Sequence, residues 1–172
     1  EVLLQKLREA SVECNKQLAE EIGIPQSAAT CCVKPSGTVS QLVDSASGIH
    51  HRHSPYYIRR VRGDIKDPLT QFMISKGVPY EPCVMKPDTT VVFSFPKKAP
   101  EGATTRNDVT AMEHLDLWLT YQRHFCKHKP SITVSVKEDE WMDVGAFVWK
   151  HFDEISGVSF LPVDGGSYRQ AP

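Results

Sequence analysis

The chain has 172 residues, of which 40% are hydrophobic and 24% are charged, and its formal net charge is -1. This composition is that of an ordinary globular protein with a buried core. The near-zero charge gives no support for binding to nucleic acid or to a membrane surface, and no apolar run is long enough to cross a bilayer. The 5 cysteines are scattered and no signal peptide opens the chain, so we expect reduced thiols and a cytoplasmic protein.

The first predicted element is a helix over residues 2–22, ended by Gly23. Residues 29–33 are rich in β-favouring side chains and predict a buried strand, followed by a turn at 36–40 and a short helix to about Asp44. The helix over 2–22 has one apolar stripe with spacings of three and four, made of Leu3, Leu7, Ala10, Cys14, Leu18 and Ile22.

After a loop over 45–55, segments with the apolar spacing of a strand continue to alternate with segments that have the spacing of a helix. Strands are predicted at 56–62, 90–95, 132–136 and 157–161, and helices at 67–77, 107–127 and 141–152, with a turn at 164–167. Asp67-Pro68 is a helix start, with an N-cap acid before a proline. This alternation predicts an α/β fold with largely parallel strands, and no break in composition divides residues 1–172 into more than a single domain.

A candidate phosphate-binding turn follows the first predicted strand, at Lys34-Pro35-Ser36-Gly37-Thr38-Val39-Ser40. A strand that turns over a glycine into a helix start presents unpaired backbone N–H groups, which favour an anion. The motif is not the common P-loop, because Lys34 precedes a proline and only one glycine is present. A simple turn without a ligand remains the alternative reading.

Longer strings in the chain carry a family resemblance. VKPSGTVSQLVDSASGIHHRHSPYYIRRVR, FSFPKKAPEGA, HKPSITVSVKEDEW, ISGVSFLP and YRQAP resemble the catalytic barrel of adenosylcobalamin-dependent (class II) ribonucleotide reductases, especially the monomeric ribonucleoside-triphosphate reductase type. The resemblance implies a ten-stranded α/β barrel made of two half-barrels, of which this chain is a C-terminal half-barrel fragment. It also implies that backbone amides of Ser36, Gly37, Thr38, Val39 and Ser40 hold the substrate phosphates.

The resemblance further implies a reaction and its partners. The intact enzyme would reduce a ribonucleoside triphosphate to the 2′-deoxyribonucleoside triphosphate, with adenosylcobalamin as cofactor and a thioredoxin-type dithiol as reductant. The family carries its radical cysteine in an Asn-x-Cys-x-Glu pattern, which does not occur in this chain. We therefore expect no catalytic residue here, and expect the remainder of the reductase chain to supply it. A non-catalytic nucleotide-binding module, or an assembly partner of a separate first half, is the alternative function.

A second departure concerns the last predicted strand. Class I reductases carry two adjacent tyrosines there that relay a radical, whereas this chain has Ser159-Phe160-Leu161-Pro162. Phenylalanine and leucine do not undergo that reversible oxidation. The substitution favours the cobalamin-dependent class.

Several polar clusters have simpler explanations than catalysis. His50, His51 and His53 lack the second ligand pair of a zinc site, so we expect no metal there. Adjacent Cys31 and Cys32 would form a strained disulfide and are expected to be small buried hydrophobes. The arginine cluster is expected to pair with neighbouring groups, with nucleotide contact as the alternative, and consists of Arg59, Arg60 and Arg62. The acidic cluster is expected to cap a helix and consists of Glu138, Asp139 and Glu140.

We predict that this chain alone has no reductase activity, because it lacks the radical cysteine with its flanking Asn and Glu. The purified chain, mixed with adenosylcobalamin, a ribonucleoside triphosphate and a dithiol, should form deoxynucleotide no faster than a control without protein. Deoxynucleotide above that control would contradict the prediction.

Overall fold

A computed structural model describes residues 1–37, 39–163 and 170. Its internal contacts divide the chain into two compact units, whereas the sequence predicts a single domain. Unit 1 comprises residues 1–52 and 104–163, and unit 2 is described over residues 53–103 and at Gln170. Each unit is described separately below. No helix among the described residues is long and apolar enough to cross a membrane.

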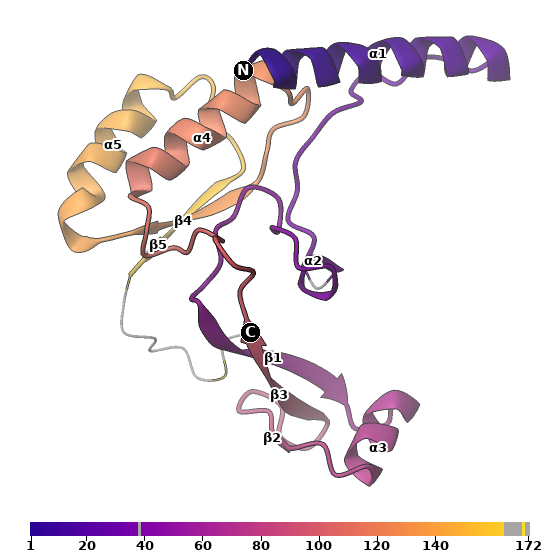
Figure 1. The fold of residues 1–172 in the computed structure, drawn as a ribbon, viewed down its shortest axis with the longest axis vertical. Coiled ribbons are helices and arrows are strands. Elements are labelled where there is room, and N and C mark those ends of the chain that lie inside the picture. The colour runs from indigo at the N-terminus through magenta and orange to yellow at the C-terminus, as the bar shows by residue number, and fades with distance from the viewer. Residues whose placement is uncertain (38, 164–169, 171–172) are drawn as a thin grey trace. The chain divides into compact units, whose positions relative to one another are not determined.

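Unit 1 is built on the strand β4 (Ile132–Val136), which pairs in parallel with β5 (Val158–Pro162). The helices α4 (Ala111–His124) and α5 (Trp141–Lys150) lie side by side over this small sheet (Figure 1). Ile132, Val134 and Val136 alternate along β4, so their side chains share one face, and all three are buried against both helices. This face is the core of unit 1.

The ends of α4 and α5 follow from local sequence. Thr110 caps α4 and forms a capping box with Glu113, a signal that the expected start at residue 107 missed. The short 3-10 turn Glu138–Glu140 precedes α5, and Glu140 accepts hydrogen bonds from the backbone N–H groups of Lys137 and Ala111. The expected capping role of this acidic cluster is confirmed for Glu140.

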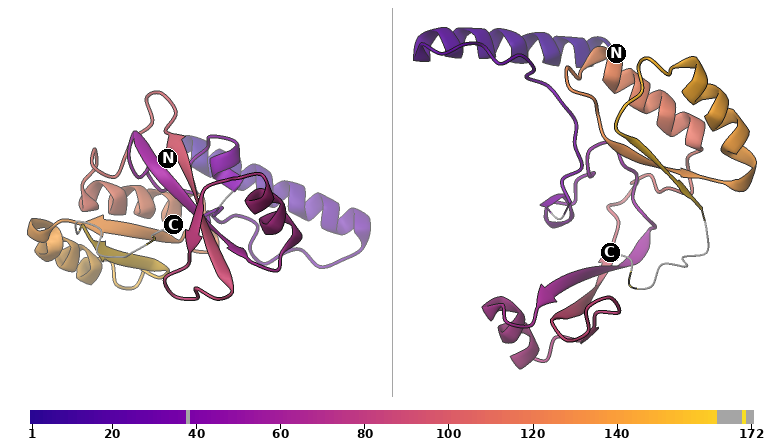
Figure 2. Two further views of the ribbon diagram at one scale, coloured as in Figure 1. Left: turned by 90° about the horizontal axis from the view of Figure 1, so that it is seen from below. Right: turned by 180° about the vertical axis from the view of Figure 1, so that it is seen from behind.

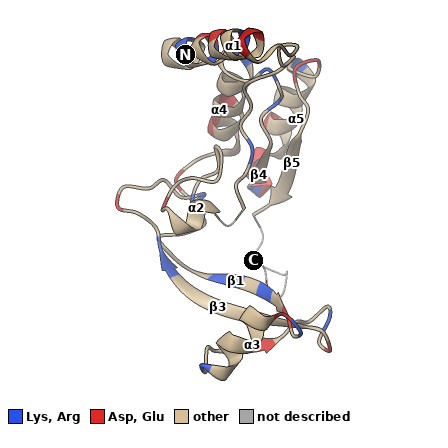
Figure 3. Ribbon diagram, turned by 90° about the vertical axis from the view of Figure 1, so that its right-hand side faces the viewer, with Lys and Arg blue, Asp and Glu red and all other residues tan. Residues whose placement is uncertain are grey.

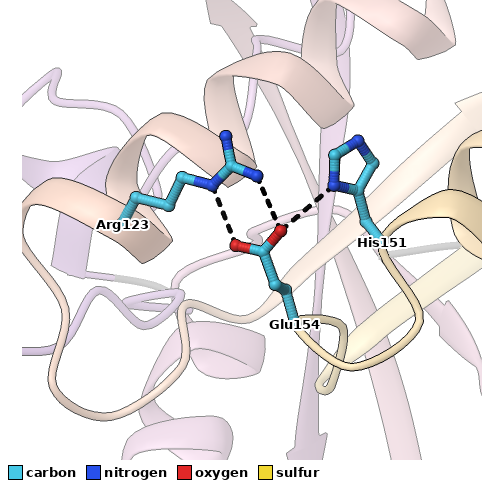
Figure 4. Close-up of polar contacts among 3 residues, drawn as sticks. All are labelled: Arg123, His151 and Glu154. Atoms are coloured by element: carbon cyan, nitrogen blue, oxygen red, sulfur yellow. Dashed lines mark hydrogen bonds and ion pairs between the residues drawn. The ribbon is translucent and has the colours of Figure 1, made fainter.

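An ion pair joins the end of α4 to the segment after α5 (Figure 4). Arg123 donates from Nε and Nη2 to the two carboxylate oxygens of Glu154, at 2.8 and 2.6 Å, and His151 Nδ1 lies 3.1 Å from Glu154 Oε1. The bond from Arg123, followed by that from His151, lowers the pKa of Glu154 to about 2. The site is solvent-accessible, so this pair fixes geometry more than it adds stability.

The N-terminal part of unit 1 differs most from expectation. Helix α1 (Val2–Ile22) forms as predicted and is the long indigo helix in Figure 2. Its apolar stripe is exposed, and only Ala19 among its residues is buried. Residues 29–33 have no regular secondary structure, so the predicted strand is wrong. Cys31 and Val33 still use their carbonyl groups, which accept hydrogen bonds from the N–H groups of Lys127, His128 and Ser131. The short helix α2 (Val39–Leu42) follows.

Unit 2 is an antiparallel sheet in the order β1-β3-β2, with one helix. Strand β1 (Tyr56–Asp64) pairs along its whole length with β3 (Thr90–Lys98), and the short β2 (Tyr80–Pro82) was not predicted. The predicted α/β class is therefore confirmed, but parallel pairing among the described strands is limited to β4–β5 and the isolated bridge between Arg52 and Thr105. Pro96 lies opposite Ile58 within β3 and does not end the strand as expected.

The start of the helix in unit 2 agrees with its local sequence. Helix α3 (Pro68–Ser75) begins at the predicted Asp67-Pro68, where the Asp67 carboxylate accepts a hydrogen bond of 2.9 Å from the N–H of Thr70. The predicted turn at 164–167 lies outside the described residues.

We predict that Trp118→Phe lowers the free energy of unfolding by about 1–3 kcal/mol. Trp118 is fully buried on α4, and its indole N–H donates to the Pro130 carbonyl at 2.9 Å, so the variant leaves a buried carbonyl unpaired. Trp149→Phe is the matched control, because Trp149 is 84% exposed. Denaturant unfolding followed by circular dichroism should separate the two variants, and equal effects would contradict the prediction.

A buried histidine predicts a pH dependence of stability. His114 on α4 is buried, its Nε2–H donates to the Ile49 carbonyl at 2.9 Å, and burial lowers its pKa to about 4. In the unfolded chain, the imidazole has its ordinary pKa of 6.5 and is protonated below that pH. The free energy of unfolding should therefore be largest above pH 6.5 and fall by about 2 kcal/mol between pH 7 and pH 5.

His114→Gln is the control for this pH dependence, because glutamine can donate to the same carbonyl but does not titrate. The loss of stability between pH 7 and pH 5 should be about 2 kcal/mol smaller in this variant than in the parent chain. Parallel pH profiles of the two proteins would contradict the assignment.

Candidate functional site

The candidate phosphate-binding loop lies in unit 1, before helix α2. Gly37 has a φ of +63°, the left-handed conformation that glycine adopts without strain, and α2 begins two residues later at Val39. Thr38, one of the predicted contact residues, lies outside the described residues. The turn at Gly37 and the short helix after it are present as predicted, but α2 begins at Val39, within the range predicted for the turn, and ends at Leu42 rather than near Asp44.

The backbone amides of this loop divide into two groups. Ser36 N–H donates to Ser47 Oγ at 3.1 Å, so this amide is used within the protein. Within the described part of the chain, the N–H groups of Gly37, Val39 and Ser40 have no hydrogen-bond partner. Of these three unbonded amides, those of Gly37 and Val39 belong to exposed residues, whereas Ser40 is buried.

The hydroxyl of Ser40 is a further polar group without a hydrogen-bond partner among the described residues. Its side chain is 3% exposed, and no other described residue bonds to its Oγ. A buried hydroxyl without a hydrogen bond costs about 1–3 kcal/mol. This unusual arrangement occurs at the first turn of α2, beside the unbonded amides.

Lys34 does not serve as a free cation for this loop. Its Nζ donates to the Lys129 carbonyl at 3.0 Å and to Ser131 Oγ at 2.7 Å. Gly48, with a φ of +63°, closes the loop from the other side, since a Cβ there would lie 3.1 Å from the Lys34 carbonyl oxygen. Close backbone packing therefore requires glycine at position 48, a role that the sequence analysis missed.

Arg52 holds the far end of the loop. It is buried, and its guanidinium donates to Gln41 Oε1 at 3.1 Å and to the Ser45 carbonyl at 2.7 Å. Its backbone is fixed in turn by bonds with the Thr104 carbonyl and the Arg106 N–H. The only sequence signal for Arg52 was its place in the family-like string, because its partners are separated from it in the chain.

The histidines near the loop are structural. Thr133 N–H donates to His50 Nε2 at 2.9 Å, and His50 Nδ1 lies 2.7 Å from the Ser47 carbonyl. Because one ring nitrogen accepts a hydrogen bond and the other meets a carbonyl, His50 is neutral with its proton on Nδ1. Desolvation, and then the neighbouring His50, lowers the pKa of His51. No group of three metal-ligating side chains occurs among the described residues.

Adjacent Cys31 and Cys32 differ in their exposure. Cys31 is buried and Cys32 is exposed, so the expectation of two buried hydrophobes is confirmed for Cys31 and wrong for Cys32. Both are free thiols. Ser159–Pro162 lies on β5, as the sequence predicted.

The predicted arginine cluster lies on β1 in unit 2, where basic residues follow the strand (Figure 3). Arg62 donates to the Gln170 carbonyl at 2.9 Å. Two nearby acids bond to backbone groups: Asp64 accepts from the Lys66 N–H, and Asp67 caps α3. Ligand contact by these arginines therefore stays a prediction.

Comparison with known proteins identifies the chain's relatives. No protein-family model matches it. An adenosylcobalamin-dependent ribonucleoside-triphosphate reductase from Euglena gracilis is 34% identical over 158 residues, which cover 91% of this chain and 22% of the relative. A probable enzyme of the same name from Dictyostelium discoideum is 31% identical over 166 residues, covering 93% and 22%.

A solved structure agrees with the sequence relatives. A B12-dependent (class II) ribonucleotide reductase matches with a TM-score of 0.77 and 27% identity, over 98% of this chain and 24% of that one. The chain thus spans less than a quarter of the length of these relatives. It is homologous to part of the adenosylcobalamin-dependent ribonucleotide reductases, which confirms the family resemblance of its sequence.

Proposed function

We propose that this chain is the C-terminal part, a half-barrel, of the catalytic barrel in an adenosylcobalamin-dependent ribonucleoside-triphosphate reductase. The intact enzyme would replace the 2′-hydroxyl of a ribonucleoside triphosphate with hydrogen, using a thioredoxin-type dithiol as reductant. Support comes from relatives that bear this name and align with nearly the whole chain. The small parallel sheet β4–β5, with helices packed on one face, is compatible with a segment of an α/β barrel.

Within that enzyme, the loop at Ser36–Ser40 would hold the substrate phosphates. The observation that carries this proposal is the set of three unbonded amides at Gly37, Val39 and Ser40, next to the buried, unbonded hydroxyl of Ser40. Amides at the start of a helix donate to an anion and need no charged side chain. The Ser36 amide is already bonded to Ser47, so Ser36 would contribute through its side chain.

The loop's contribution to the reaction would be to bind and orient the nucleotide. Holding the phosphates fixes one end of the substrate, so that the ribose is presented to groups outside this chain. Since the chain lacks the Asn-x-Cys-x-Glu pattern, the radical step belongs to the remainder of the polypeptide. An upstream pattern of this kind in the same reading frame would support the enzyme over a non-catalytic nucleotide-binding module.

Three ring nitrogens of His50 and His114 are already bonded within the protein and are not free to bind cobalt. Both ring nitrogens of His50 face backbone groups, and Nε2 of the buried His114 is bonded to the Ile49 carbonyl. Ligation of cobalt at any of these three nitrogens would break one of these bonds. Adenosylcobalamin is therefore proposed for the intact enzyme alone, with no step assigned to residues of this chain.

We predict that Gly37→Val in the full-length enzyme raises the substrate dissociation constant at least tenfold and leaves cobalamin binding unchanged. A Cβ at Gly37 meets nothing within 4 Å inside the protein, so the variant acts through backbone strain and by blocking approach of a ligand. Ser36→Ala should weaken binding less, by about 1 kcal/mol for one lost hydrogen bond. Equilibrium binding of nucleotide and of cobalamin, measured separately, tests both variants.

Gly77→Val is the matched control. Gly77 has a φ of +75° and equally open surroundings, but it follows helix α3 in unit 2. It carries the same kind of backbone strain but is not part of the loop. Equal loss of nucleotide and cobalamin binding in Gly37→Val would mean that the loop supports the fold, and no loss of either would remove the loop from the site.

A further inference from the structure

Helix α5 in unit 1 is apolar on two faces. Val144 and Phe147 are buried against the core, as expected for a helix that covers a sheet. The outward face carries Met142 and Trp149, each 84% exposed. A surface helix normally has a polar outer face, whereas a helix that is hydrophobic all round is buried. The outer face of α5 therefore has the composition of an interior surface.

The outward residues form one continuous stripe. Met142, Gly145, Ala146 and Trp149 are spaced at i, i+3, i+4 and i+7, which places them on the same side of the helix. Gly145 and Ala146 are small, and a Cβ built at Gly145 meets nothing within 4 Å. The stripe is thus a shallow depression between two large side chains, a shape that admits the ridge of another helix. None of its four residues is charged.

The stripe cannot be buried by turning α5 within unit 1. Val144, Phe147 and the partly buried Val148 fix the opposite side of the helix against β4 and α4. Rotation would expose that core. A cover for the stripe must therefore come from outside the core of unit 1.

We propose that, in the full-length reductase, the α5 stripe is covered by an apolar helix from the part of the polypeptide outside this chain. The inference rests on the proposed function, because it assumes the longer enzyme. This chain covers 22% of the curated relatives cited and 24% of the solved structure, so more than three quarters of their length is available to supply the cover. The partner chemistry follows from the stripe: aliphatic side chains without charge, on a helix able to approach Gly145 closely.

Hydroxyl-radical footprinting of the full-length enzyme tests the proposal without any substitution. Met142 should be oxidised at least tenfold more slowly in the native enzyme than in the enzyme unfolded in guanidinium. Met112, which is partly buried against the core of unit 1, is the matched methionine that reports the protection given by unit 1 itself. Oxidation of Met142 within twofold of the unfolded rate, with Met112 protected, would overturn the proposal. Protection that appears only with dimerisation in light scattering would assign the cover to a second copy and would also overturn it.

Two substitutions at Gly145 provide an independent test, because the melting temperature should change in opposite directions on an open and on a covered helix face. On an open helix face, Gly145→Ala and Gly145→Leu should both raise the melting temperature, because glycine is a poor helix former. Under a close-packed cover, Gly145→Leu should instead lower the melting temperature by several degrees below that of the parent enzyme. A higher melting temperature for Gly145→Leu than for the parent enzyme would contradict the proposal.

The two proposals can fail separately. An enzyme without reductase activity but with protected Met142 would refute the proposed function and support the covered stripe. An active reductase with fully reactive Met142 would do the opposite.

Discussion

Three hydrogen bonds connect the core strand of unit 1 to the candidate phosphate loop. Thr133 N–H, on β4, donates to His50 Nε2, His50 Nδ1–H meets the Ser47 carbonyl, and Ser47 Oγ accepts from the Ser36 N–H. The first bond leaves Nδ1 as the protonated nitrogen, which is the one that can donate to a carbonyl. The imidazole thus acts as a neutral spacer between two backbone segments. The position of the loop depends on this connection and on the core that holds β4.

The core explains why this connection can be rigid. Ile132, Val134 and Val136 are buried on one side of β4, which fixes the register of the strand and leaves the Thr133 amide free to bond with His50. Arg52 and Gly48 then limit the other end of the loop by side-chain bonds and close backbone packing. Helices α4 and α5 support the site from a distance because they hold the face opposite Thr133.

Sequence patterns predicted the features that depend on neighbouring residues. The cap at Asp67-Pro68, the turn at Gly37 and the strand at 132–136 each arise from a few adjacent side chains, and each is present. The strand at 29–33 failed because its β-favouring residues bond irregularly with residues 127–131, far along the chain. The antiparallel pairing of β1 with β3 was missed for a related reason: periodicity identifies a strand but not its partner. In the site, Ser47, His50 and Arg52 could not be found from spacing, because their roles come from contacts that only the fold creates.

The way the loop is built restricts the kind of ligand recognition it could perform. Lys34 would be the obvious cation for a phosphate, but its ammonium group is bonded to Lys129 and Ser131. The Ser36 amide is likewise used internally. What stays unbonded in the described part of the loop is backbone N–H at Gly37, Val39 and Ser40. Such donors read the shape and charge of a phosphate but have no contact with a base, so a loop of this kind would position any nucleotide alike and leave discrimination among bases to other parts of an enzyme.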